Sequence, residues 1–129
     1  MKMKTQINNN IDVIEKNGKE YKIAITGIYE IEAMQDLPPH RFVTASGFLC
    51  PLGEAIFGVT LKECKSGEMA TIQISGIALV ETAGKILSRT DVRAYDDNTG
   101  RAIFRAYAEP IIHPLDITDA AGDFIRIKL

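Results

Sequence analysis

The stretch Ile23-Ala-Ile-Thr-Gly-Ile-Tyr-Glu-Ile-Glu32 returns 49 residues later as Ile72-Gln-Ile-Ser-Gly-Ile-Ala-Leu-Val-Glu81. In both copies apolar residues alternate with polar or small ones, which is the period of a β-strand with one buried face. The identical positions are Ile23/Ile72, Ile25/Ile74, Gly27/Gly76, Ile28/Ile77 and Glu32/Glu81. The fold is therefore predicted to contain two related strand-rich units.

The similarity continues after this stretch. Gly53-Glu-Ala-Ile-Phe57 matches Gly100-Arg-Ala-Ile-Phe104, and Ser66–Ile72 parallels Ala121–Ile127. Three matches in the same order predict an internal repeat of about residues 21–69 and 70–129, inside one domain of residues 11–129. Because two copies are too few for an open solenoid, we expect a compact all-β barrel or sandwich of the β-tulip kind.

Glycines recur at equivalent places in the two units. Gly27 and Gly76 interrupt a strand at the same point, which is typical of a β-bulge or a sharp bend. The remaining glycines shared by the repeat are predicted to lie in turns: Gly53, Gly100, Gly67 and Gly122.

The start of the domain is predicted to be a hairpin. Two strand-like runs flank Asn17-Gly18, and both residues accept the positive φ that a type I′ turn requires. Residues 1–10 are polar and are expected to form an extended N-terminal arm. The best helix candidate, Ile31–Asp36, ends before Pro38-Pro39, and a strand is favoured there.

Composition narrows the classes of function. The 129 residues carry 46% hydrophobic and 25% charged side chains, as a globular domain does, with a net charge of −2. A protein that neutralises phosphates usually has a basic excess, so nucleic acid is not the expected partner. The chain has no apolar run near the roughly 20 residues that span a bilayer, and no apolar stretch follows its basic start. We expect a soluble protein made in the host cytoplasm.

The reactive residues do not form a known motif. His40 and His113 each adjoin a proline, belong to no metal-binding spacing, and are expected at the surface or at an interface. Cys50 and Cys64 lack the CxxC spacing and are expected to be reduced thiols, at least one of them buried; a disulfide between them stays open. The sequence predicts no catalytic residue, no metal site and no cofactor.

The residues alone leave two alternative functions open, an enzyme and a ligand-binding module. The repeat places Glu32 and Glu81 equivalently, and paired acids in one cleft can act as general acid and base. An enzyme would require these carboxylates to converge. A ligand-binding module would instead need an exposed aromatic surface, to which Tyr29, Tyr95 and Tyr107 are the candidate contributors.

Four stretches of the chain resemble one known family. They are Gly53–Leu61, Lys65–Glu81, Gly100–Ala102 and Ala120–Leu129, and together they resemble the small capsid decoration (cement) proteins of tailed bacteriophages. The resemblance implies a virion protein, not an enzyme, that binds the major capsid protein on the outside of the head and stabilises the capsid. It also implies a homotrimer with an N-terminal segment that reaches onto the capsid or onto a neighbouring copy.

The expected capsid or subunit interface comprises Met3, Ile7, Pro38, Pro39, His40 and Arg41. The alternative is a host-binding or carbohydrate-binding β-module of a head fibre or tail.

Overall fold

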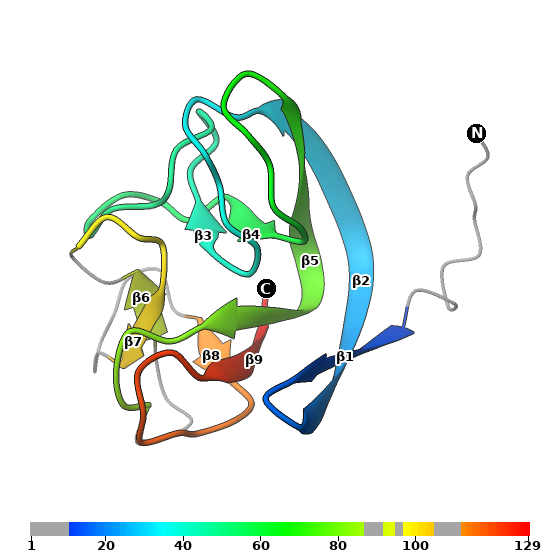
Figure 1. The fold of residues 1–129 in the computed structure, drawn as a ribbon, viewed down its shortest axis with the longest axis vertical. Helices are drawn as coiled ribbons and strands as arrows, with labels where there is room; N and C mark the ends of the chain where they lie inside the picture. Colours follow the sequence, from blue (N-terminus) through cyan, green and yellow to red (C-terminus); the bar gives the residue numbers. More distant parts are fainter. Residues whose placement is uncertain (1–10, 87–91, 95–96, 105–111) are drawn as a thin grey trace.

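The computed structural model describes residues 11–86, 92–94, 97–104 and 112–129. These residues form β-strands and turns and contain no helix (Figure 1). The strands are β1 (Ile11–Lys16), β2 (Lys19–Glu32), β3 (Phe42–Val43), β4 (Gly58–Thr60), β5 (Met69–Glu81), β6 (Val92–Ala94), β7 (Ala102–Phe104), β8 (His113–Pro114) and β9 (Phe124–Lys128). The all-β prediction is confirmed, and Met3 and Ile7 lie outside the described residues.

The long strand β5 organises the main sheet. Its one edge pairs with β2, while the opposite edge pairs first with β4 and then with β9. The order β1-β2-β5-β4-β3 ends at β1 and β3, β8 is added beside β9, and β6 and β7 form a separate two-stranded sheet. The two ends of the order do not pair, so the sheet is not closed into a barrel, which was one of the two predicted forms of the all-β fold. With only two residues, β3 is too short to supply the ladder that closure would need.

The predicted hairpin is confirmed. Lys16 pairs with Lys19, and the turn between them has φ 55° at Asn17 and 78° at Gly18. These positive angles match the turn to the twist of its strands.

The bulge predicted at the shared glycines is also confirmed. The β2–β5 register shifts by one residue on each side of Gly27, which leaves Thr26 without a partner on β2 and Ile74 without one on β5. Gly76, at φ +99°, brings its backbone so close to Ala24 that a Cβ would overlap the carbonyl oxygen of Ala24. An L-residue is therefore disfavoured at this position both by its dihedral angle and by space.

A buried amide holds the bulge together. Gln73 is fully buried, and the two hydrogens of its Nε2 are shared among the carbonyls of Ala24 (3.0 Å), Ser75 (3.0 Å) and Ile77 (3.1 Å). The hydroxyls of Thr26 and Ser75 lie 2.8 Å apart beside it. Side chains thus supply donors to the irregular backbone, whereas Oε1 of Gln73 is buried and has no hydrogen-bond partner among the described residues.

The two most similar sequence segments pair with each other, because they form β2 and β5. Equivalent turns of the two units also make equivalent hydrogen bonds. Gly67 N donates to Ala33 O (2.7 Å), and Gly122 N donates to Thr82 O (2.8 Å). Such recurrences are what a duplication predicts.

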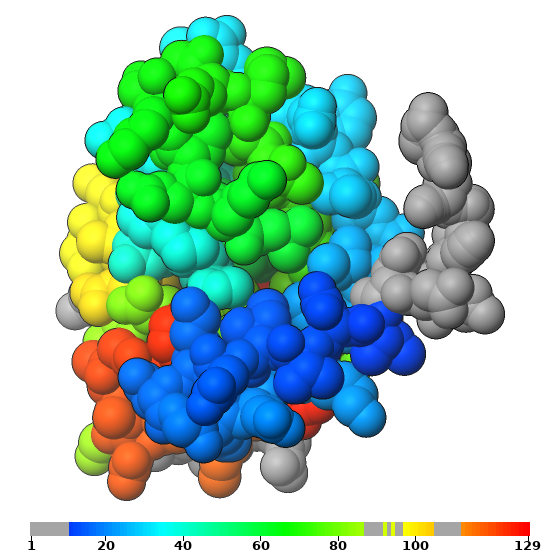
Figure 2. Space-filling model, turned by 45° about the vertical axis from the view of Figure 1, so that its right-hand side comes forward, coloured from blue at the N-terminus to red at the C-terminus, as the bar shows by residue number. Residues whose placement is uncertain are grey.

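Apolar packing joins the parts of the sheet. The main core lies between β5, β9 and the β3–β4 and β6–β7 pairs, and it includes Phe42, Val59, Val80, Val92, Ile125 and Ile127. On the hairpin, Tyr21 and Ile23 bury their side chains with Leu79 of β5, and Phe124 of β9 packs against this cluster. Figure 2 shows the hairpin, in blue, lying over the C-terminal segment in orange and red.

Candidate interaction surface

An ion-pair cluster ties one turn to the end of β5. Glu81 accepts from Arg41 Nη2 at 3.2 Å and lies 3.9 Å from Arg101 Nη1. Arg101 also pairs with Asp97 at 3.0 Å, and Arg41 Nη1 donates to Thr99 O at 2.9 Å. Burial alone would raise the pKa of Asp97, but hydrogen bonds from Thr99 and Arg101 outweigh it and hold that pKa below its usual value. Arg41 is therefore engaged within the chain.

His40 is buried, so the expected surface histidine is wrong at this position. Its ring meets Phe124 edge to face at 5.7 Å, and its backbone has φ 62°. Burial, followed by the positive charge of Lys16, lowers the pKa of His40 to about 4. The ring of His40 packs on Phe124 of β9, and Lys16 of the β1–β2 hairpin lies over the same Phe124 ring, 5.4 Å from its centroid.

The neighbouring prolines belong to the same internal segment. Pro38 and Pro39 are partly buried, and Pro38 O accepts a hydrogen bond of 2.7 Å from Thr60 Oγ1. The segment 38–41 is thus held by contacts inside the chain, and a role for it in binding stays a prediction.

The two repeat-equivalent glutamates lie at opposite ends of β5. Glu32 faces Met69, the first residue of β5, whereas Glu81 is its last residue. A strand rises by about 3.3 Å per residue, so the two carboxylates do not share a cleft. The acid–base pair that an enzyme would need is not formed by these residues.

Other candidate chemical groups are buried or scattered. Cys50 and Cys64 are both free and buried, as predicted for reduced thiols, and burial raises the pKa of Cys50 to about 11. Within the described ranges no three His, Cys, Asp or Glu side chains are grouped as metal ligands. In the same ranges, the structure has no helix that is long and apolar enough to cross a membrane.

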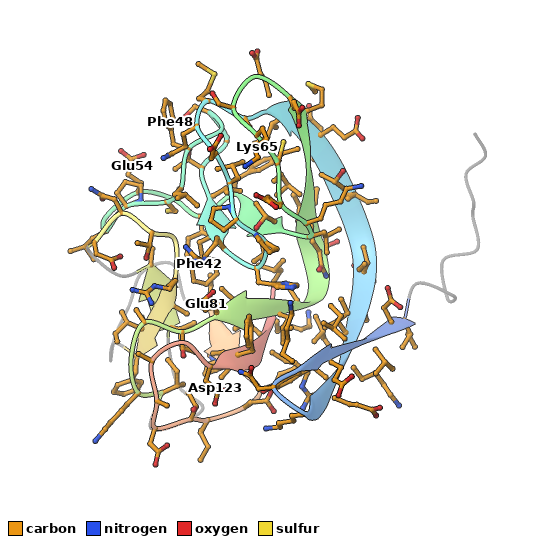
Figure 3. All side chains as sticks on the ribbon, viewed as in Figure 1. Phe42, Phe48, Glu54, Lys65, Glu81 and Asp123 are labelled. Atoms are coloured by element: carbon orange, nitrogen blue, oxygen red, sulfur yellow. The ribbon has the colours of Figure 1, made fainter. Side chains whose placement is uncertain are left out.

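Large apolar side chains are exposed at the loop end of the molecule. We call Met34, Phe48 and Leu52 the loop patch; their exposed fractions are 51%, 43% and 46%. Figure 3 shows Phe48 and Glu54 among the loops to the left of the long strand β5. Contiguous exposed apolar groups are typical of a surface that binds another molecule, and Met34 lies against Gly47, the neighbour of Phe48 in the chain.

A hollow of about 640 Å³ adjoins the loop patch. Its wall combines an aromatic ring with hydroxyl, amide and carboxylate groups. The lining residues are Gln35, Thr44, Ser46, Phe48, Leu49, Pro51, Glu54 and Asn98. They come from three separate segments of the chain, so that only the folded protein brings them together.

Specific hydrogen bonds set the shape of these loops. Leu49 N donates to Gln35 Oε1 (2.9 Å), and Met34 N donates to Gly47 O (2.9 Å). Gly47 has φ +92°, and a Cβ there would overlap the carbonyl oxygen of Glu32. The loop that carries Phe48 is therefore fixed against the end of β2.

The aromatic surface proposed from sequence is only partly within the structure. Tyr29 is 57% exposed, and its ring meets Phe57 at 5.6 Å, while Tyr95 and Tyr107 lie outside the described residues. Sequence patterns missed the loop patch. The available signal was a pair of large apolar residues, Phe48 and Leu52, in a turn-rich stretch where no strand was expected.

The fold has a counterpart among solved structures. The crystal structure of the head fiber gp8.5 N base in bacteriophage phi29 matches with a TM-score of 0.62, over 80% of this chain and 92% of that chain. The fold is shared. Sequence identity is 9%, and no family model and no curated protein matches this chain.

Proposed function

We propose that this protein is a structural component of a tailed-phage head, and that it binds the outer surface of the assembled head. The observation that carries the proposal is the fold, which is shared with a head fiber base over most of both chains. The sequence resemblance to capsid decoration proteins supports the same location. In this proposal the partner is the major capsid protein, and the role is structural and not catalytic.

The loop patch is the surface proposed to face the capsid. Its apolar side chains lie beside polar groups of the hollow, and a protein-binding surface usually has an apolar centre with a polar rim. Cohesion of a lattice from many copies needs only modest contacts at each copy, because avidity multiplies them. A homotrimer at a three-fold position would bind through three loop patches at once and would gain avidity in this way.

The test is binding to undecorated heads. The purified protein is first sized by light scattering, then mixed with heads and sedimented, and saturable co-sedimentation is the expected result. The variant Phe48→Ser/Leu52→Ser should lose at least about tenfold in affinity, which corresponds to about 1.4 kcal/mol. The matched control is Ile11→Ser/Val13→Ser, which removes apolar groups of β1 that are even more exposed. Failure of the protein to co-sediment would refute the proposal.

A second candidate is a host-binding or carbohydrate-binding module at the base of a head fibre. Its support is the hollow, where Phe48 could stack on a sugar ring while Gln35 and Glu54 bond to hydroxyls. The stability of the heads separates the two candidates. A cement protein raises the temperature at which filled heads release DNA, whereas a fibre base binds without that effect and a saccharide screen then finds its ligand.

A further inference from the structure

Glu54 is the one charged residue that lines the hollow beside the loop patch. It is also the only charged residue within residues 42–61. Its side chain is exposed, and among the described residues it makes no ion pair. The arginines of the ion-pair cluster, Arg41 and Arg101, are held by other carboxylates. The side chains that line the hollow therefore sum to one negative charge.

An aromatic ring lines the same hollow. Phe48 is 43% exposed there, and Figure 3 shows it on the same side of β5 as Glu54. The face of an aromatic ring carries negative electrostatic potential and attracts a cation that lies over it. A carboxylate and an aromatic ring in one hollow therefore favour the same kind of ligand group, a positively charged one.

Several of the other polar groups are already bonded inside the chain. Thr44 Oγ1 lies 3.1 Å from Ser46 Oγ and accepts from Phe48 N at 3.3 Å. Gln35 Oε1 accepts from Leu49 N at 2.9 Å. The carboxylate is the strongest acceptor that these bonds leave free. A guanidinium or an ammonium group carries only donors, so that it matches a site with a surplus of acceptors.

Hydrogen bonds within the chain order the walls of the hollow. The turn that carries Asn98 is held by Phe42 N, which donates to Gly100 O at 2.7 Å. The turn that carries the carboxylate is closed by Glu54 N, which donates to Pro51 O at 3.3 Å. A site whose backbone is ordered before binding loses less conformational entropy when the ligand arrives.

We propose that the hollow binds a basic side chain, arginine or lysine, that the major capsid protein presents on the outside of the head. This inference rests on the proposed head binding. The cation pairs with the Glu54 carboxylate and lies over the Phe48 ring, while Leu52 makes an apolar contact beside it. Arginine is the better match, since its planar guanidinium stacks on an aromatic ring while it pairs with a carboxylate. Such a pair contributes to specificity and to the rate of association.

Binding to undecorated heads at several salt concentrations tests the pairing. Glu54→Gln keeps the shape of the side chain and removes its charge, and its affinity for heads should fall by at least about fivefold at low salt. The difference from the parent protein should shrink as salt rises, because salt screens exposed charges. The matched control, Glu30→Gln, removes an exposed charge from β2 and should bind as the parent protein does. Parent-like binding of Glu54→Gln would overturn the inference and leave head binding standing.

A titration without heads tests the class of ligand. N-acetyl-arginine amide, followed by NMR, should shift the ring signals of Phe48, and the shift should be smaller in Glu54→Gln. N-acetyl-citrulline amide has a similar shape without the charge and should shift these signals only weakly. Equal shifts with the two compounds, or none, would overturn the inference, and larger shifts with methyl glucoside would overturn it in favour of a saccharide site.

The two experiments separate this inference from the proposed function. Failure of the parent protein to bind heads would refute the proposed function and the capsid as the partner. A selective shift by the arginine compound would still support a site for a basic group in the hollow.

Discussion

The buried His40 makes the stability of the fold depend on pH in a way that can be calculated. Its imidazole is enclosed by Phe124 and by the hairpin that carries Lys16, and the pKa falls to about 4. In the unfolded chain the pKa of histidine is about 6.5. Between these two pKa values the unfolded state binds the proton and the folded state does not. The contribution of the neutral His40 to stability is therefore complete above pH 6.5 and is lost as the pH falls toward 4.

The difference between the two pKa values sets the size of the effect. Relative to pH 8, the free energy of unfolding should be lower by about 2 kcal/mol at pH 5, and by about 3 kcal/mol once the pH is below 4. Urea unfolding at pH 8 and pH 5 measures this loss, and at pH 5 most carboxylates remain ionised. Lys16, Arg41 and Glu81, the charged groups that act on His40, are present in every protein compared.

The matched variant is His40→Asn, because asparagine tolerates the φ of 62° and does not titrate. Its stability should be lower at both pH values, since the contact with Phe124 is lost. Its loss between pH 8 and pH 5 should be about 2 kcal/mol smaller than that of the parent. Equal losses in the two proteins would refute the argument that His40 is held neutral by burial.

Three further substitutions test how the sheet is built, each by urea unfolding. Gly76→Ala should lower the free energy of unfolding by about 3 kcal/mol or more, because its Cβ would overlap the Ala24 carbonyl oxygen. Gly67→Ala is the control: it has a similar φ but open space around the Cβ, and it should lower the free energy of unfolding by about 1 kcal/mol. Equal losses in the two variants would contradict this prediction. Glu81→Gln should lose about 2 kcal/mol, since it leaves the partly buried Arg41 without its counter-charge, and the repeat-equivalent Glu32→Gln should change stability by less than about 0.5 kcal/mol. Gln73→Leu should cost about 2 kcal/mol because the carbonyls of Ala24, Ser75 and Ile77 lose the amide group that donates to them. An unchanged unfolding midpoint would contradict this.

Features with a local cause were predictable from the sequence. The Asn17-Gly18 turn needs only two residues that accept positive φ, and the all-β class follows from alternation along each strand. The bulge was predicted because Gly27 and Gly76 interrupt similar strands at the same point. The sequence could not show that these two glycines lie beside each other across one strand pair.

Other features depend on contacts between residues far apart in the sequence, and only the tertiary structure decided them. His40 is next to two prolines, which suggests an exposed turn, but the hairpin some twenty residues earlier and β9 at the C-terminus bury it. The sheet stays open, and no local pattern shows whether the first and last strands of a sheet will meet. The hollow beside Phe48 combines three segments, and side chains from segments so far apart meet only after the backbone has folded. The sequence by itself determined the all-β class, the hairpin turn and the bulge, but the strand favoured at Ile31–Asp36 ends at Glu32. The fold decided which side chains became core, ion pair or exposed surface.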